Sequence, residues 1–100
     1  MPQRHDHKFF AAMSCANKVT WTNDIQQMFT KVDIQHMQTK GIDLSSYQDV
    51  MVNAVSIYSQ VSSGGMPPPG TIGPDGQPEQ PWSQDKVNTF GCWIQQGTPK

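Results

Sequence analysis

The chain has 100 residues, of which 35% are hydrophobic and 15% are charged, and its net charge is -1. This length predicts one domain with a thin core. The seven Lys and Arg residues are scattered singly, which excludes the basic face that binds nucleic-acid phosphates or an anionic membrane surface. No apolar run approaches the ~20 residues that span a bilayer, so we expect a soluble chain, for which a cytoplasmic location is slightly favoured.

Residues 1–20 show no clear period and are predicted to form an arm in front of a helical domain at 21–100. We interpret this arm as part of the mature chain and not as a signal peptide. His5 and His7 alternate around Asp6, a pattern that can offer two imidazoles to a divalent metal. A third ligand is not evident nearby in the sequence, so we predict a solvated arm and no metal site.

The chain has two cysteines, Cys15 and Cys92. A disulfide between them would tie the N-terminal arm to the last helix. Two buried thiols in a reducing compartment are favoured over this disulfide, because a cytosolic chain usually keeps its thiols, and both alternatives stay open.

The first strong helix is predicted from Trp21 to Met37, because apolar residues and one histidine recur at helical spacing. This stripe consists of Ile25, Met28, Phe29, Val32 and His36. His36 is therefore expected to face inward, whereas Asp33 falls off the stripe and is expected to face solvent.

The second helix is predicted from Asp43 to Ser63, with Asp43 or Ser45 as its cap. Its apolar face consists of Tyr47, Val50, Met51, Ala54, Ile57, Tyr58 and Val61. Residues 64–81 read GGMPPPGTIGPDGQPEQP, which forbids helix or central strand and predicts a long loop. The third helix is predicted from Ser83 to Gln96, with Ser83 as its cap.

Four segments in this order resemble class I cytochrome c over residues 21–99. They are the stretch from Ile25 to His36, the middle helix DLSSYQDVMVNAVSIYSQV, the sequence GMPP at 65–68, and the tryptophan-led segment from Trp82 to Gly97. The resemblance implies an all-α fold with three main helices in a cytochrome-c-like arrangement and a long Pro/Gly-rich loop. The same pattern of segments also resembles haem-free cytochrome-c-like domains that accompany redox and natural-product enzymes.

The resemblance assigns His36 and Met66 as the axial ligands of a haem, a recognised pair for haem iron. Val32 and Gln35 then stand where the two haem-attaching cysteines of the family would be. Neither side chain can form a thioether, so covalent haem attachment at this site is excluded. We expect no cofactor, with a buried neutral His36 and a core-filling Met66 as the ordinary interpretation, and non-covalent haem as the alternative.

A cytochrome-like fold without haem must fill the haem volume or leave it open. Seven bulky residues are candidates for lining such a pocket, which would take a small apolar ligand: Trp21, Phe29, Tyr47, Met51, Tyr58, Trp82 and Trp93. The sequence favours a filled core. We therefore predict a non-catalytic binding or accessory module with a protein partner or a small apolar ligand, and keep two alternatives. These are an electron-transfer protein with non-covalent haem and a small secondary-metabolism enzyme that uses the vacated pocket.

Overall fold

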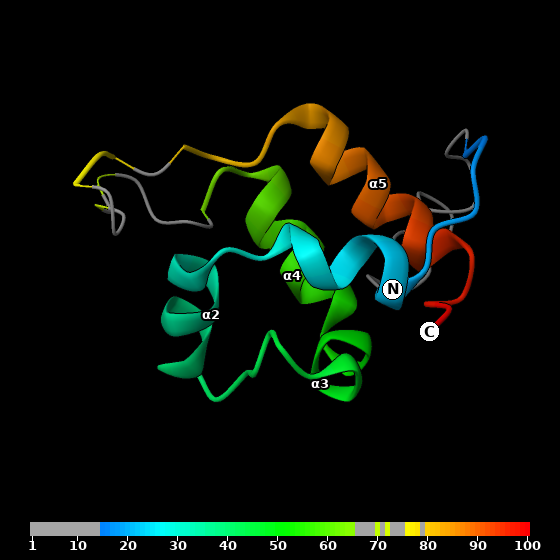
Figure 1. The fold of residues 1–100 in the computed structure, drawn as a ribbon, viewed down its shortest axis with the longest axis horizontal. Helices are drawn as coiled ribbons and strands as arrows, with labels where there is room; N and C mark the ends of the chain where they lie inside the picture. The colour runs from blue at the N-terminus through cyan, green and yellow to red at the C-terminus, as the bar shows by residue number, and fades with distance from the viewer. Residues whose placement is uncertain (1–14, 66–69, 71, 73–75, 79) are drawn as a thin grey trace, which may run out of the picture.

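The computed structural model describes residues 15–65, 70, 72, 76–78 and 80–100, and over these residues the chain is helical (Figure 1). Its elements in chain order are η1 (Trp21–Ile25), η2 (Gln26–Met28), α2 (Lys31–Gln38), α3 (Tyr47–Val52), α4 (Ala54–Ser62) and α5 (Gln84–Gln95). Among the described residues, Ile72 and Pro78 form one isolated antiparallel β-bridge. The predicted all-α class is confirmed, and the cytochrome-c-like arrangement of the helices stays a prediction.

The first predicted helix is interrupted, so the prediction of one helix from Trp21 to Met37 was wrong. Phe29 is extended, with φ −84° and ψ 125°, and Thr30 caps the start of α2. The Thr30 hydroxyl accepts a hydrogen bond from the Asp33 amide, and the Asp33 carboxylate accepts one from the Thr30 amide, both at 3.1 Å. This capping box begins a new helix, because it satisfies two amides that a helix start leaves unpaired.

The new start changes which residues of α2 face the core. Asp33 and Met37, one turn apart, are buried, whereas Val32 and His36 are half-buried. The prediction that Asp33 faces solvent was therefore wrong, because it extended a single helical period across the break at Phe29.

The second predicted helix is divided into α3 and α4 at Asn53, whose φ of −102° and ψ of 16° interrupt it. Ser46, not the predicted Asp43 or Ser45, caps α3 by accepting a hydrogen bond from the Asp49 amide. The inward face is nevertheless the predicted one. Its buried members are Val50, Ala54, Ile57 and Val61.

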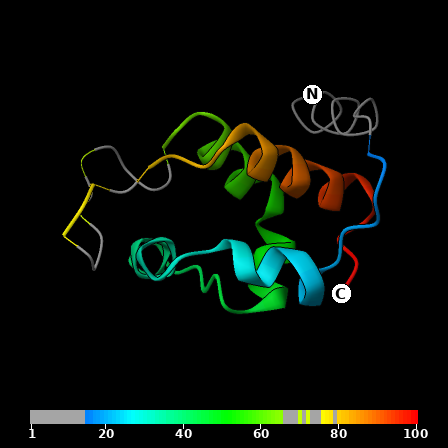
Figure 2. The ribbon, with the colours of Figure 1, turned by 45° about the horizontal axis from the view of Figure 1, so that its top comes forward.

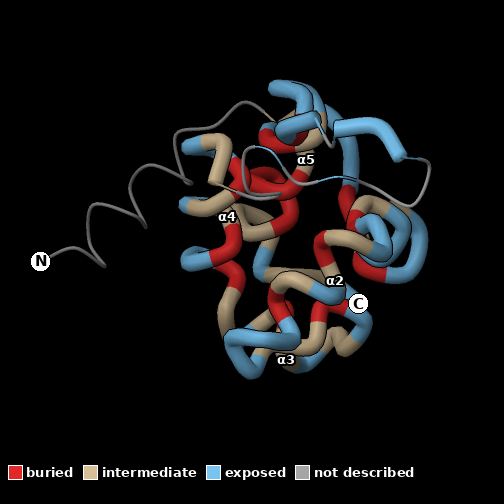
Figure 3. Tube along the Cα trace, turned by 90° about the vertical axis from the view of Figure 1, so that its left-hand side faces the viewer, coloured by how far each residue is buried: buried red, intermediate tan, exposed pale blue. Residues whose placement is uncertain are grey.

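The third predicted helix is α5, and its predicted cap is confirmed, since the Ser83 hydroxyl accepts a hydrogen bond from the Lys86 amide. α5 packs against α4 on one side and against η1 on another, as Figures 1 and 2 show. The buried stretches of α4 and α5 lie toward each other in Figure 3, which places the core between these helices. Of the helices described, none combines the length and apolar character needed to cross a membrane.

Cys15 and Cys92 form a disulfide, with their Cα atoms 5.6 Å apart, which resolves the alternatives that the sequence left open. The bond joins residues 77 positions apart in the chain. By the loop-entropy relation, closing a loop of that length destabilises the unfolded chain by about 4.5 kcal/mol. This contribution lies just below the lower end of the stability of native domains, about 5–15 kcal/mol, so a domain in the middle of that range still stays folded without the bond.

Candidate functional site

Three aromatic rings meet beside the last residues of the chain and form what we call the tail-side cluster: Trp21, Tyr47 and Trp93. Their ring centroids are 5.8 to 6.3 Å apart. Two of these rings have backbone acceptors for their polar atoms, because Trp93 Nε1 donates to the Pro99 carbonyl at 2.9 Å and the Tyr47 hydroxyl donates to the Thr98 carbonyl at 2.6 Å. Both hydrogen bonds are neutral, and the Lys100 ammonium lies 5.6 Å from the centroid of the Tyr47 ring.

A second group of rings, the Asp33-side cluster, consists of Phe29, Trp82 and Phe90. Their centroids are 5.5 to 6.1 Å apart. Phe90 also lies 5.4 Å from Trp93, so the two clusters form one continuous aromatic core. Contacts at these distances are the favourable tilted and edge-on arrangements of aromatic pairs.

Five of the seven predicted pocket residues therefore pack against one another in these clusters, and they are Trp21, Phe29, Tyr47, Trp82 and Trp93. The other two, Met51 and Tyr58, are half-buried and pack against the core. Burial raises the pKa of the Tyr58 hydroxyl. Entry of a small apolar ligand between these residues stays a prediction.

Among the charged residues that the structure describes, Asp33 is the one that is buried, and its side chain is fully enclosed. Its Oδ2 atom accepts hydrogen bonds from the Thr30 amide at 3.1 Å and from Trp82 Nε1 at 3.3 Å. Among the described residues, nothing donates a hydrogen bond to Oδ1. An unpaired buried polar atom costs about 1–3 kcal/mol, so this carboxylate is the least satisfied polar group near the rings.

Lys86 extends the surroundings of Asp33. Its ammonium lies 4.5 Å from the centroid of the Trp82 ring and donates to the Met28 carbonyl at 2.8 Å. The indole of Trp82 is thus held between a cation on its face and a carboxylate at its Nε1 atom. Sequence reasoning missed this arrangement, although the Thr30-to-Asp33 capping-box spacing was a signal that Asp33 begins a helix.

The structure leaves the proposed haem ligands untested. His36 is half-buried near the end of α2, where its backbone carbonyl accepts a hydrogen bond from the Thr39 hydroxyl at 2.6 Å. Met66 lies outside the described residues, as do His5 and His7. Within the described parts of the chain, no group of three or more His, Cys, Asp or Glu side chains is placed to hold a metal ion.

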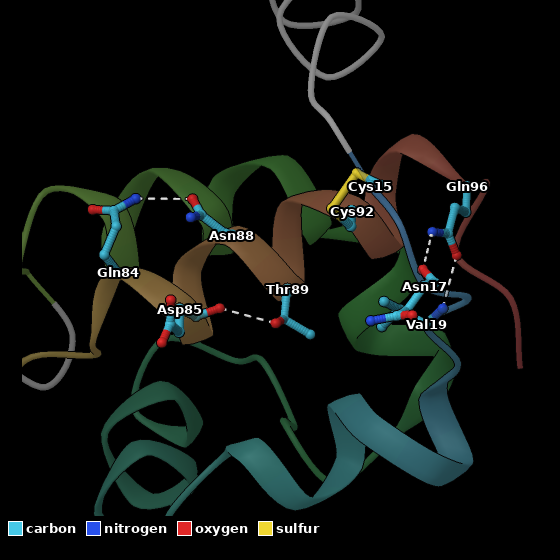
Figure 4. Close-up of a disulfide and its surroundings, with 9 residues drawn as sticks. All are labelled: Cys15, Asn17, Val19, Gln84, Asp85, Asn88, Thr89, Cys92 and Gln96. Atoms are coloured by element: carbon cyan, nitrogen blue, oxygen red, sulfur yellow. Dashed lines mark hydrogen bonds between the residues drawn. A yellow bond between two sulfur atoms is a disulfide. The ribbon is translucent and has the colours of Figure 1, made fainter.

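Two surface grooves flank the exposed face of α5. One, of about 420 Å³, lies between α5 and η1–η2 and is lined by Asn23, Asp24, Gln27, Met28, Asp85, Lys86 and Thr89. The other, of about 250 Å³, adjoins the disulfide and is lined by Cys15, Ala16, Asn17, Val19, Asp85, Asn88, Thr89 and Cys92 (Figure 4). Both grooves share Asp85 and Thr89. Polar and apolar atoms contribute about equally to both linings, so neither groove has the mainly apolar lining that is typical of a small-molecule site.

The chain is similar to two curated fungal proteins. It is 34% identical over 88 residues to cyclopenase penL of Penicillium thymicola, and 35% identical over 86 residues to cyclopenase asqI of Emericella nidulans. Each match covers 82% of this chain but 12% of the relative. No protein-family model and no solved structure matches the chain. The similarity therefore spans most of this domain and a small part of each cyclopenase.

Proposed function

We propose that this domain is a non-catalytic accessory module of a cyclopenase-like system in secondary metabolism. In this proposal it acts through its folded surface, either beside a larger protein or as one part of it. The observation that carries the proposal is the asymmetry of the matches, which cover 82% of this chain and 12% of each cyclopenase. A segment that small is a natural candidate for a structural or docking role within the longer protein.

The aromatic core supports a role without chemistry in the interior. Phe90 links the two clusters through ring contacts of 5.4 to 6.1 Å, so five of the side chains expected to border a vacated pocket lie in one continuous set of aromatic contacts. We therefore propose a cofactor-free core. The proposal does not depend on a cytochrome c origin.

The disulfide bears on where the module works. Disulfides persist in oxidising compartments and are rare in the cytosol. The Cys15–Cys92 bond therefore supports an oxidising compartment over the cytoplasmic location that the sequence slightly favoured. We include this location in the proposal.

Complementation in trans tests the function. A form of asqI that lacks the segment matching this chain is purified, and its cyclopenase turnover is measured with and without the full chain. We expect the chain alone to show no turnover, to bind the shortened enzyme on size-exclusion chromatography, and to raise its activity or its folded yield. The control is the Trp93→Ala chain, which loses one of the two rings where the clusters meet. It tests whether complementation requires the folded domain.

Two results would contradict the proposal. Cyclopenase turnover by the chain alone would show that it is catalytic. A folded chain that neither binds the shortened enzyme nor changes its activity or yield would show that it is not an accessory module of this system.

A further inference from the structure

We propose that the Cys15–Cys92 disulfide is a redox clasp. In its oxidised form it holds residues 15–18, here named the clasp segment, against α5. Reduction by a protein or small-molecule dithiol releases the clasp segment while the helical core stays folded. This inference is independent of the proposed function, because it rests on the surroundings of the disulfide alone.

The two cysteines differ in accessibility. Cys92 is in α5 and only 9% exposed, whereas Cys15 is half-buried on the clasp segment. Both line the groove of about 250 Å³, and Figure 4 shows their bond at the point where the clasp segment meets the helix. An incoming thiolate that enters from this groove therefore reaches the sulfur of Cys15 more easily than that of Cys92.

The side chain of Gln96 also holds the clasp segment and the neighbouring Val19 to the end of α5. Gln96 accepts a hydrogen bond from the Val19 amide at 2.8 Å through Oε1, and donates one to the Asn17 carbonyl at 2.9 Å through Nε2 (Figure 4). Asn17 and Lys18 are exposed. The bond between Gln96 and the Asn17 carbonyl is exposed, and water can replace it at little net cost, so it alone does not offset the entropy of ordering residues 15–18. The bond to the Val19 amide is partly buried.

The helical core is held by other contacts. Thr20 caps η1, where its hydroxyl accepts a hydrogen bond from the Asn23 amide and its own amide donates to Asp24. The amides of Trp21 and Thr22 donate to the Pro99 and Lys100 carbonyls. The side chain of Val19 is itself buried in the core. Release is therefore expected to stop at Val19, because neither this burial nor these bonds require the sulfurs to be joined.

The reaction is an ordinary thiol–disulfide exchange. A thiolate of the reductant attacks the sulfur of Cys15, a mixed disulfide forms, and the sulfur of Cys92 leaves as a thiolate that takes a proton from solvent. The second thiol of the reductant then attacks its own sulfur in the mixed disulfide and releases Cys15. The protein gains two electrons and two protons, and the reductant leaves as a disulfide.

Release of the clasp segment removes most of one wall of the groove. Cys15, Ala16 and Asn17 of the clasp segment form that wall together with the buried Val19, and Asn88 and Thr89 of α5 lie on the opposite side. The redox state of the disulfide thus controls access to this polar face of α5.

Limited proteolysis of the full chain tests the clasp. The oxidised protein and a sample treated with dithiothreitol without denaturant are digested with trypsin, with cleavage after Lys18 followed by mass spectrometry. We expect both thiols to become alkylatable and cleavage after Lys18 to accelerate about tenfold or more, as for a segment that has become locally open. The near-ultraviolet circular dichroism of the buried tryptophans should persist, and cleavage after Lys86 in α5 should stay slow.

Variants separate the disulfide from its surroundings. Cys15→Ser should match the reduced protein, whereas oxidised Gln96→Ala should keep Lys18 protected because its disulfide is intact. The proposal is overturned if reduction requires denaturant, if Lys18 stays protected after reduction, or if Gln96→Ala exposes it as much as reduction does. Loss of the tryptophan signal on reduction, or failure of Cys15→Ser to fold, also overturns it by making the disulfide a staple of the whole fold.

Discussion

At the two ends of the aromatic core, the polar atoms of the rings donate their hydrogen bonds to different kinds of acceptor. In the tail-side cluster, Trp93 and Tyr47 donate to backbone carbonyls that carry no net charge. In the Asp33-side cluster, Trp82 donates to a buried carboxylate whose second oxygen has no donor among the described residues. A substitution at the first end removes a matched neutral bond, whereas a substitution at Asp33 also removes a buried charge. Stability measurements should therefore distinguish the two ends.

The largest effect is expected at the point where the clusters meet. Trp93 is fully buried, contacts Phe90 and donates to the Pro99 carbonyl. Trp93→Ala should lower the free energy of unfolding by about 4 kcal/mol, the range of buried Trp truncations, or prevent folding. Urea unfolding followed by far-ultraviolet circular dichroism measures the change. A folded variant that loses less than about 2 kcal/mol would contradict the central place of Trp93 in the core.

The second largest effect on stability is expected when the buried carboxylate of Asp33 is removed. Asp33→Ala leaves Trp82 Nε1 and the Thr30 amide without their acceptor, and should destabilise the protein by about 2 kcal/mol. Asp33→Asn keeps one oxygen acceptor and should cost less. The matched control is Asp49→Ala. Asp49 also stands three residues after its helix cap, but it is half-buried and its carboxylate accepts a hydrogen bond from the Asp43 amide at 2.9 Å, so its loss should cost about 1 kcal/mol.

The same urea experiment decides whether Asp33→Ala lowers or raises the free energy of unfolding. If Asp33→Ala stabilises the protein, the unpaired oxygen costs more than the two accepted bonds contribute, as with some buried charges replaced by apolar groups. That outcome would reverse the expected order of the Asp33 and Asp49 variants.

A smaller effect is expected in the tail-side cluster. Tyr47→Phe keeps the ring contacts with Trp21 and Trp93 but removes the hydrogen bond to the Thr98 carbonyl. The loss should be about 1 kcal/mol, as for a single neutral hydrogen bond. Thermal unfolding of Tyr47→Phe beside the unsubstituted chain measures it. No change would mean that water replaces the carbonyl as the partner.

The smallest effect, on the absorbance spectrum and on the melting temperature, is expected when haemin is added to the protein. Because the rings of both clusters contact one another, we expect haemin to produce no Soret shift characteristic of axial ligation and no rise in melting temperature. A Soret band that is present in the unsubstituted protein and absent in His36→Ala would contradict this and restore His36 as a haem ligand. Absorbance titration at a fixed protein concentration makes the comparison.

Local signals in the sequence predicted the start of α5 and the inward face of α3 and α4, because both depend on residues close together in the chain. The break at Phe29 was missed, since the apolar period appeared to continue across it while the Thr30 capping box began a new helix. The burial of Asp33 follows from that break. Its contact with Trp82 joins residues 49 positions apart and has no local signal.

The disulfide could not be chosen from the sequence, because two cysteines fit either a bond or two thiols. The core-forming character of the aromatic residues was foreseeable, but their division into two clusters was not. That division depends on how α5 lies against η1 and α4, which places Phe90 and Trp93 between rings from distant segments.

Segment exchange in a cyclopenase tests the accessory role most directly. The part of asqI that matches this chain is replaced by the corresponding part of this chain, and cyclopenase turnover is measured beside that of unmodified asqI. The account predicts a folded, active chimera, because the module contributes structure and the rest of the enzyme contributes chemistry. A folded chimera without turnover, whose activity returns only when asqI side chains are restored inside the exchanged segment, would place the chemistry in this domain and contradict the account.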